Sequence, residues 1–460
     1  MKSNIFCHRE PEGRGDLTII AGRWPRFARH DRRHFFAVMV LGFLTLLSST
    51  LHARIFIQID QASDKKFPIA VADLIPQGKS SSIGEDIPDI ISKNLALTGM
   101  FDLIPNNQHP TDGPGISPNL GAIQFAPWTL IGAQALVIGT YSGGKSGVQV
   151  DMALFDPVTA TRLVSKTYTT NINEISIVAN HFSDEIMREL TGERGVFSTE
   201  IAYIQAAKKG KEIGIMDMNG ENAGVITKDK SINLSPAFSP DGQSIAYTSF
   251  SKTGNAEIYV TGSHGGGSKK ITSSGTVNVS PTWSPNGLLT VAQAQEGDTN
   301  LVLLNMAGNI VRKLTSSFGI DVNPSWSPDG SQFVFASERA GRLHLFKADA
   351  SGNHVERLTY VGVQNDNPAW SPKGDKIVFQ SLEGNWDLFI MNTDGSMLQR
   401  LTSGSGNNES PTWAPNARFI AFTSTRSGKT AVNIMREDGA NQTEVGPAGS
   451  LQPSWGPWVK

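Results

Sequence analysis

One stretch of the chain matches the spacing of a phosphate-binding loop. Gly139, Gly144, Lys145 and Ser146 fit the pattern G-x-x-x-x-G-K-S and follow an apolar run. That chemistry requires the loop to open a helix, whose free N–H groups bind the phosphate oxygens. The residues that follow, VQVDMALFD, instead alternate with a period of two, which predicts a strand. We therefore interpret the loop as a hairpin turn and expect no nucleotide site.

Other catalytic and metal-binding patterns lack the residues they need. The sequence has no G-x-S-x-G elbow and no H-E-x-x-H pair, and its single cysteine is Cys7. Five histidines lie beyond residue 53, without the spacing of metal ligands: His109, His181, His264, His344 and His354. Asp241 and Asp329 could bind cations, but both sit in Ser-Pro-Asp-Gly turns, where turn formation explains them better. We expect no enzymatic activity, no cofactor and no metal.

A Pro-x-aromatic motif repeats six times and sets the architecture of the second half of the chain. The copies read SPAFSP, SPTWSP, NPSWSP, NPAWSP, SPTWAP and QPSWGP. Their aromatic residues are Phe238, Trp283, Trp326, Trp370, Trp413 and Trp455. A period of roughly 40 to 50 residues built from short strands is typical of a β-propeller, with one blade per repeat. Tryptophans could stack on sugars, but their fixed place before a turn predicts packing between blades.

The two ends of the series predict how the ring closes. Residues 200–229 hold the second, third and fourth strands of a blade without a first strand, and residues 452–458 hold a first strand with nothing after it. An open ring would leave two unpaired strand edges. Joining the two fragments gives an all-β six-bladed β-propeller over residues 198–460, closed by the carboxyl-terminal strand.

The segment before the propeller has a different pattern. Residues 54–197 combine alternating strands with two amphipathic helices, one near Asp86 that ends at Gly99 and one over 173–190, which predicts a small α/β domain. Residues 1–53 read as a signal peptide with a long basic region, because arginines precede a 17-residue apolar run that ends near Ala53. A retained membrane anchor is the alternative.

The net charge bears on the class of partner, and the cysteine content bears on the cellular compartment. The formal net charge is −2, which argues against a nucleic-acid partner because such a partner needs a basic face. Removal of residues 1–53 would leave 32 basic and 38 acidic residues and no cysteine. A chain without cysteine suits an oxidising compartment.

Polar residues recur just before each motif proline. Three residues ahead of the proline lie Asn233, Asn278, Asp321, Asn365, Asn408 and Ser450. Two residues ahead the chemistry varies from blade to blade: Leu234, Val279, Val322, Asp366, Glu409 and Leu451. If the first strand is innermost, the polar set forms a ring at one mouth of the central channel, which suits docking of a protein loop better than catalysis. The alternative is that these asparagines only make turns.

The junction LTGERGVFSTEIAYI and repeats such as SPAFSPDGQSIAYTS resemble the TolB family of periplasmic propeller proteins, over essentially all of residues 54–460. The resemblance implies an amino-terminal domain with an anticodon-binding-like α/β fold, used without RNA, and a monomer that reaches membranes only through its partners. It implies a role in outer-membrane integrity and in envelope constriction at cell division, with the lipoprotein Pal at the channel mouth and TolA at the mature amino terminus. The Pal-binding candidates are Asn233, Asn278, Val279, Asp321, Asn365, Asp366, Asn408 and Glu409. The TolA-binding candidates are Arg54, Ile55, Phe56, Ile57, Gln58, Ile59 and Asp60.

Two other functions compete with this one. A propeller hydrolase would need a catalytic domain of some 200 or more residues, and roughly 140 non-propeller residues without a nucleophile elbow do not supply it. A scaffold that binds peptidoglycan or another carbohydrate through the propeller is the second alternative. One repeat also departs from the family pattern, because Asn416 and Ala417 replace the usual Asp-Gly and should weaken that turn.

Overall fold

The computed structural model describes residues 66–78, 81–110, 123–144, 147–250, 254–272, 277–295, 297–404 and 406–458. All of them belong to one compact unit that spans Ile55–Lys460. The predicted signal peptide and the predicted TolA-binding strand lie outside the described residues. Within the described ranges, no helix is long and apolar enough to cross a membrane.

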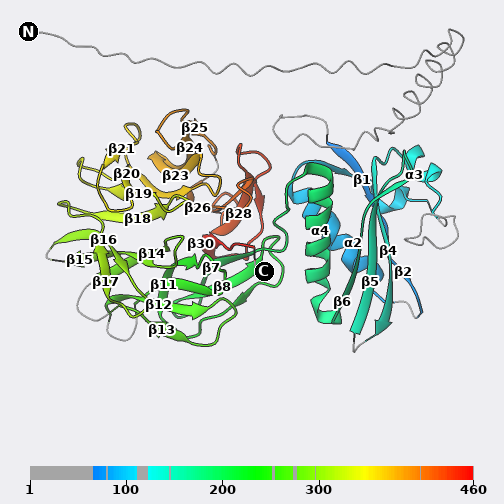
Figure 1. Cartoon of the computed structure of the whole chain (residues 1–460), viewed down its shortest axis with the longest axis horizontal. Helices are drawn as coiled ribbons and strands as arrows, with labels where there is room; N and C mark the ends of the chain where they lie inside the picture. Colours follow the sequence, from blue (N-terminus) through cyan, green and yellow to red (C-terminus); the bar gives the residue numbers. More distant parts are fainter. Residues whose placement is uncertain are drawn as a thin grey trace, which may run out of the picture. The chain divides into compact units, whose positions relative to one another are not determined.

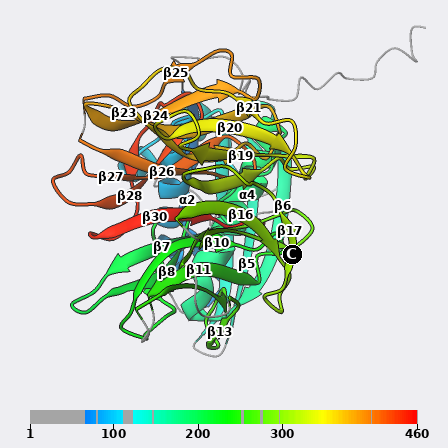
Figure 2. The same ribbon diagram turned by 90° about the vertical axis from the view of Figure 1, so that its left-hand side faces the viewer.

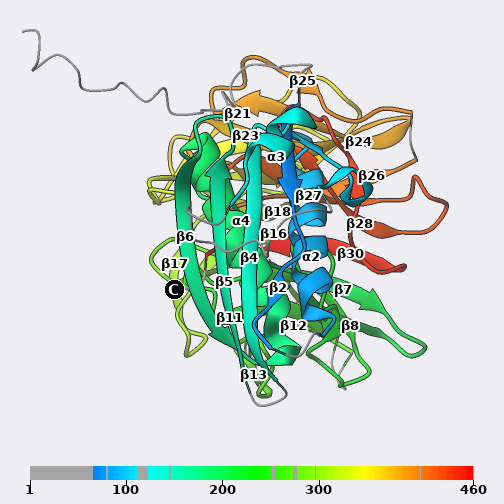
Figure 3. The same cartoon turned by 90° about the vertical axis from the view of Figure 1, so that its right-hand side faces the viewer.

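A mixed β-sheet forms the core of the amino-terminal region (Figure 3). Its strand order is β3-β1-β4-β5-β6, with β2 added beside β4. The strands are β1 (Phe67–Val71), β2 (Ile75–Pro76), β3 (Phe101–Leu103), β4 (Ala135–Gly144), β5 (Gly147–Asp156) and β6 (Thr161–Thr170). The pairs β1–β3, β1–β4 and β2–β4 are parallel, whereas β4, β5 and β6 form antiparallel hairpins. The pairing of Gly144 with Gly147 confirms that the apparent phosphate loop joins two strands and opens no helix.

Two long helices pack on each other beside one face of this sheet (Figure 1). The helix α2 (Ile83–Leu97) begins one turn before the predicted start and contains Pro88. Proline lacks an N–H, so the Gly84 carbonyl loses its helical partner and instead accepts a hydrogen bond from the Leu74 N–H at 2.8 Å. The helix α4 (Ile175–Thr191) ends, as predicted, at Gly192, whose φ of 76° suits a left-handed cap.

Among the described residues of this region, three shorter helical segments accompany the two long helices. They are α3 (Ala126–Leu130) and two 3-10 turns, η1 (Asn106–Gln108) and η3 (Ile172–Glu174). The pattern of the sequence did not predict α3. Its buried Trp128 packs with Leu136, Ile138 and Phe155 on the sheet face away from α2 and α4.

Six four-stranded blades form the propeller, and each blade begins with the motif strand. Blade 2 is β10 (Ile232–Phe238), β11 (Ser244–Phe250), β12 (Ala256–Gly262) and β13 (Ser268–Lys270). Blade 3 is β14 (Val277–Trp283), β15 (Leu289–Gln295), β16 (Asp298–Leu304) and β17 (Ile310–Lys313). Blade 4 is β18 (Asp321–Trp326), β19 (Gln332–Ser337), β20 (His344–Asp349) and β21 (Glu356–Arg357). Blade 5 is β22 (Asn365–Trp370), β23 (Lys376–Glu383), β24 (Asn385–Asn392) and β25 (Gln399–Arg400). Blade 6 is β26 (Asn408–Trp413), β27 (Phe419–Ser424), β28 (Ala431–Arg436) and β29 (Thr443–Glu444).

Blade 1 closes the ring and combines the two ends of the propeller sequence. It consists of β30 (Ser450–Trp455), β7 (Glu200–Ala206), β8 (Lys211–Asp217) and β9 (Gly224–Val225). The strand β30 pairs antiparallel with β7, and Figure 2 shows the two side by side. The buried Trp455 donates a hydrogen bond from Nε1 to Thr199 Oγ1 at 2.8 Å. The predicted six-bladed fold and its closure by the carboxyl-terminal strand are therefore confirmed.

The motif aromatics pack between blades, as predicted. Trp283 of blade 3 donates from Nε1 to the Ala237 carbonyl of blade 2 at 3.0 Å. Trp413 of blade 6 makes the same bond to Ala369 of blade 5, also at 3.0 Å. In blade 6 the turn expected to be weak is kept, because Ala417 adopts a φ of 57° and its N–H bonds to the Ala414 carbonyl at 2.9 Å.

Candidate functional site

The six innermost strands enclose a narrow central channel. A cavity of 190 Å³ is lined by three consecutive residues of each inner strand. In each triplet a polar residue precedes the motif proline, and a small residue follows it. The polar members are Ser235, Ser280, Asn323, Asn367, Ser410 and Gln452. We call these six residues the channel ring.

A break in strand pairing brings the channel ring to the channel. In every inner strand the register with the second strand shifts across the ring residue and its proline, for example between Leu234 and Ala237. Each ring residue has a positive φ, between 46° and 53°. This left-handed backbone is costly for any residue with a side chain, and such strain is often retained at functional positions.

Hydrogen bonds link the channel ring from blade to blade. Asn323 Nδ2 donates to Asp366 Oδ1 at 2.8 Å, and Ser280 Oγ bonds to Asn323 Oδ1 at 2.6 Å. Further round, Ser410 N–H donates to Gln380 Oε1 at 2.7 Å, and Ser235 N–H donates to Gln452 Oε1 at 2.9 Å. The network holds short polar groups at the wall of the channel, where they can exchange hydrogen bonds with an entering segment.

The polar set expected at the channel mouth is instead buried between blades. Its members are at most 1% exposed: Asn233, Asn278, Asp321, Asn365, Asn408 and Ser450. Each of these residues lies two positions before a ring residue, and in a regular strand the two would share a face. The shift in register at the ring residue breaks this relation, so the ring residue faces the channel while the earlier residue stays buried. An exposed ring made of these residues is therefore wrong. We call them the interblade belt.

The interblade belt joins the inner strand of one blade to the outer strands of the blade before it. Asn408 of blade 6 donates from Nδ2 to Asp387 Oδ1 of blade 5 at 3.1 Å. Thr402 Oγ1 donates to the same carboxylate oxygen at 2.7 Å. Asn365 of blade 5 bonds to His344 Nδ1 of blade 4 at 3.0 Å, and Ser450 Oγ accepts from the Val432 N–H of blade 6 at 2.9 Å. These bonds give the belt a structural role.

The two predicted carboxylates lie one residue before the channel ring. Asp366 and Glu409 are half-buried in blades 5 and 6. Burial raises the pKa of Glu409, and burial also raises the pKa of Asp366, although hydrogen bonds from Asn323 and the Asn367 N–H partly oppose the shift. Val279, the third candidate at this position, is half-buried and packs against the core of blades 3 and 4. Half-buried carboxylates of this kind can accept hydrogen bonds from a basic or amide group.

The structure thus separates the predicted binding residues into two groups. Val279, Asp366 and Glu409 each directly precede a ring residue in the chain, whereas the other five Pal-binding candidates belong to the belt. The TolA-binding candidates, residues 54–60, lie outside the described residues. Sequence reasoning missed the channel ring, although one signal was present: the residue directly before every motif proline is Ser, Asn or Gln.

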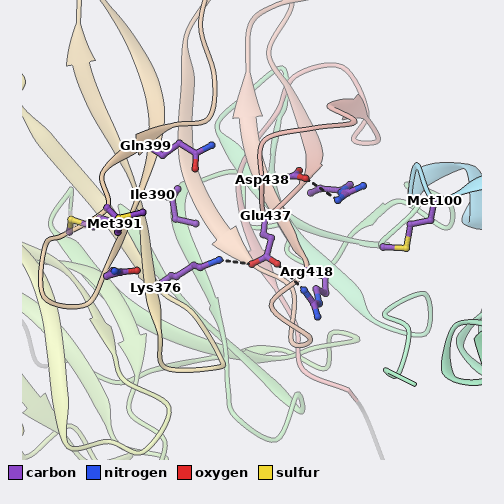
Figure 4. Close-up of a pocket in the computed structure, with 11 residues that line it drawn as sticks. Met100, Lys376, Ile390, Met391, Gln399, Arg418, Glu437 and Asp438 are labelled. Atoms are coloured by element: carbon purple, nitrogen blue, oxygen red, sulfur yellow. Dashed lines mark hydrogen bonds and ion pairs between the residues drawn. The ribbon is translucent and has the colours of Figure 1, made fainter. Parts of the chain in front are cut away.

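A second cavity, of 500 Å³, lies between the turns of blades 5 and 6 and Met100 (Figure 4). Its charged groups are already paired. Glu437 binds Lys376 at 3.1 Å and Arg418 at 3.0 Å, and Arg436 binds Asp438 at 2.9 Å. Arg418 also pairs with Glu193, at 2.7 Å, so this cavity belongs to the contact between the propeller and the residues that precede it. Across the described part of the chain, no group of three or more His, Cys, Asp or Glu is placed to hold a metal ion.

Comparison with known families gives two matches that together cover most of the chain. The TolB beta propeller domain matches residues 187–459, and the TolB amino-terminal domain matches residues 55–163. The chain belongs to the TolB family. The resemblance inferred from the sequence is thereby confirmed, and so is the fold class.

Relatives and a solved structure agree with this assignment. A "Tol-Pal system protein TolB" of Nitrosococcus oceani is 31% identical over 232 residues, which are 48% of this chain and 52% of that protein. One of Actinobacillus succinogenes is 34% identical over 216 residues, 45% of this chain and 48% of that protein. The matched part thus spans about half the length of these relatives. The crystal structure of TolB from Acinetobacter baumannii has a TM-score of 0.74 at 24% identity and covers 87% of this chain and 99% of that one, which shows a shared fold.

Proposed function

We propose that this chain is a periplasmic component of the Tol–Pal system and that its propeller docks the lipoprotein Pal at the channel mouth. The observation that carries the proposal is the channel ring, six polar residues held in a left-handed backbone around one opening. Family membership supports it, as do relatives named Tol-Pal system protein TolB. In this role the protein maintains outer-membrane integrity and supports envelope constriction at cell division.

The ring geometry favours binding over catalysis. Similar polar groups recur in all six blades, whereas a catalytic centre needs unlike groups in fixed roles. A segment of Pal that enters the channel would exchange hydrogen bonds with the ring and place a basic or amide group beside Asp366 and Glu409. We infer that the mature amino terminus, residues 54–60, engages TolA and that residues 1–53 direct export.

Calorimetric titration of Pal into the mature chain tests the proposal. Glu409→Ala should weaken Pal binding by roughly ten- to a hundredfold, because a partly buried, charge-assisted contact is typically worth about 1.5 to 3 kcal/mol. Glu444→Ala, an exposed change on the outer strand β29, is the matched control and should bind as the wild type does. Absence of Pal binding by the wild-type chain, with retention on peptidoglycan instead, would replace this proposal with the carbohydrate-binding alternative.

A further inference from the structure

The two ends of the propeller differ in what surrounds them. The turns between the first and second strands and between the third and fourth strands lie at one end, and in blades 1 and 6 this end meets the amino-terminal region. Asn219, for example, donates to Asn94 Oδ1 at 2.8 Å. The loops between second and third strands, and those between blades, lie at the opposite end. We call it the distal end, and its loops surround the mouth where the inner strands begin.

Around blade 4 the distal end exposes apolar side chains on two loops, on either side of the loop 338–343, which carries Arg339 and the exposed Arg342. The loop 315–320 exposes Phe318, which is 90% exposed, and the loop 359–364 exposes Tyr360, which is 72% exposed. Ile320, Val361 and Val363 of the same loops are also exposed. The two loops flank blade 4, because the Ile320 carbonyl accepts from the Glu338 N–H and the Asn365 N–H donates to the Leu343 carbonyl, both at 2.9 Å. Exposed apolar side chains gathered on neighbouring loops are typical of interaction sites.

Around blade 1, on the other side of the channel, the distal end is basic. The turn 207–210 carries Lys208 and Lys209, and the loop 227–231 carries Lys228 and Lys230, all exposed. The two segments lie side by side, because the Lys211 N–H donates to the Ser231 carbonyl at 2.8 Å. Within the described ranges none of these four ammonium groups forms an ion pair.

The carboxylates near these lysines are occupied with other groups. Glu212 is buried and accepts hydrogen bonds from the Thr227 hydroxyl and the Lys230 N–H, at 2.7 Å and 3.0 Å. Asp229 accepts from Asn233 Nδ2 at 3.0 Å and from the Ser231 N–H at 3.1 Å. Four lysines therefore outnumber two nearby carboxylates on two touching loops of a chain whose formal net charge is −2.

We propose that the distal end holds its protein partner in a single rotational orientation by using two unlike sectors. The apolar sector around Phe318 and Tyr360 supplies the desolvated contact, and the lysine sector, Lys208, Lys209, Lys228 and Lys230, recognises an acidic patch on the partner. The inference rests on the proposed function and deepens it. The channel ring offers a short polar group in every blade, so contacts to the ring alone distinguish one blade from the next only weakly. The two sectors remove that ambiguity.

Charge and placement favour a folded protein over a lipid surface as the occupant. The lysine and apolar sectors lie on blades 1 and 4, which are opposite each other in a ring of six. A partner with fixed patches can match this separation, whereas a bilayer presents the same chemistry everywhere. The overall negative charge of the chain also opposes adsorption to an anionic membrane.

Binding kinetics of Pal to the full mature chain test this inference. Lys208→Glu/Lys209→Glu and Lys228→Glu/Lys230→Glu should each lower the affinity about tenfold or more, mainly through the association rate, because charges at an interface edge steer the encounter. The difference should shrink as salt rises, since screening acts on exposed charges. Phe318→Ala/Tyr360→Ala should instead raise the dissociation rate. Lys269→Glu/Lys313→Glu, on the outer strands β13 and β17, changes the charge equally and should leave both rates unchanged.

Carbodiimide cross-linking, which joins lysine amines to carboxylates, should connect the lysine sector to one acidic segment of Pal. If the wild type binds Pal and the lysine variants bind it as the outer-strand control does, the inference is overturned and the proposed function is left intact. Loss of Pal binding by the wild type would remove the proposed function and the inference with it. Lysine-dependent binding to phosphatidylglycerol vesicles, with unchanged affinity for Pal, would also overturn the choice of a protein partner.

Discussion

The interblade belt and the channel ring occupy the same six strands, two residues apart, yet the belt is buried between blades and the ring lines the channel. Belt residues such as Asn408 are fully buried and bond to the preceding blade. Ring residues such as Ser410 line the channel in a left-handed backbone. Both sets are polar in every blade. Residue type and repetition therefore do not separate a group that holds the ring together from one that a partner can reach.

The difference arises from the backbone. An unbroken strand would turn residues two apart to the same side, so belt and ring would share one environment. The shift in pairing at the ring residue and its proline breaks this relation and turns the ring residue toward the channel. A proline in an inner strand therefore has a specific consequence here: it interrupts the pairing, which resumes at the next residue, and the interruption coincides with the ring residue.

Removal of the closing strand should have the largest effect, because β30 supplies one member of each set. Deleting residues 450–460 removes Ser450 from the belt, Gln452 from the ring and the buried Trp455. Loss of a buried tryptophan alone typically costs about 3 to 5 kcal/mol, a large part of the roughly 5 to 15 kcal/mol that stabilises a domain. Thermal unfolding should show a strongly lowered melting temperature or no cooperative transition. Deleting residues 459–460 is the control, and equal melting of both truncated chains would contradict closure by β30.

A pair of substitutions in one strand sharpens the comparison between belt and ring. Asn408→Ala should lower the free energy of unfolding by about 1 to 3 kcal/mol, because it removes one buried hydrogen bond from Asp387 and another from Arg426. Ser410→Ala should cost less than about 1 kcal/mol, since the backbone N–H keeps its bond to Gln380. Urea denaturation of both variants measures the contrast. Similar losses of stability in the two variants would show that belt and ring share one structural role.

Most of the fold could be predicted from the sequence, because each blade carries its own local signals. The motif proline, the turn at Gly242 and its equivalents and the lone strand near Trp455 were enough to predict six blades and their closure. The site could be predicted only in part. The placement of Asp366 and Glu409 at the channel stays a prediction, whereas Asn233 and its equivalents were assigned to the wrong environment. Their environment depends on the shift in register, which strand periodicity alone does not reveal.

The distal sectors could not be predicted for a related reason. Lys208 and Lys230 are separated in the sequence by β8, and only the pairing of Lys211 with Ile232 brings their loops together. Phe318 and Tyr360 are likewise joined only through blade 4. A cluster built from loops that are far apart in the sequence can be recognised only once the folded propeller is known.

The smallest expected effect is the contribution of Glu409, which directly precedes Ser410, to the pH dependence of the protein's stability. Burial raises the pKa of Glu409 above its ordinary value of 4.5, so the folded protein disfavours the ionised form. The resulting loss of stability is complete above the raised pKa, where Glu409 is ionised in both folded and unfolded chains. It disappears below pH 4.5, where the carboxyl is neutral in both.

Glu409→Gln removes this titration while it keeps the size of the side chain. We expect the variant to be more stable than the wild type near neutral pH, by no more than about 1 kcal/mol, and the advantage to vanish as the pH falls below the ordinary range of a glutamate. Urea unfolding of both proteins across this pH range measures the difference. Because Pal binding should use the ionised group, the same substitution should weaken Pal binding while it stabilises the free protein. If the variant is less stable than the wild type at neutral pH, Glu409 has a structural role like that of the interblade belt.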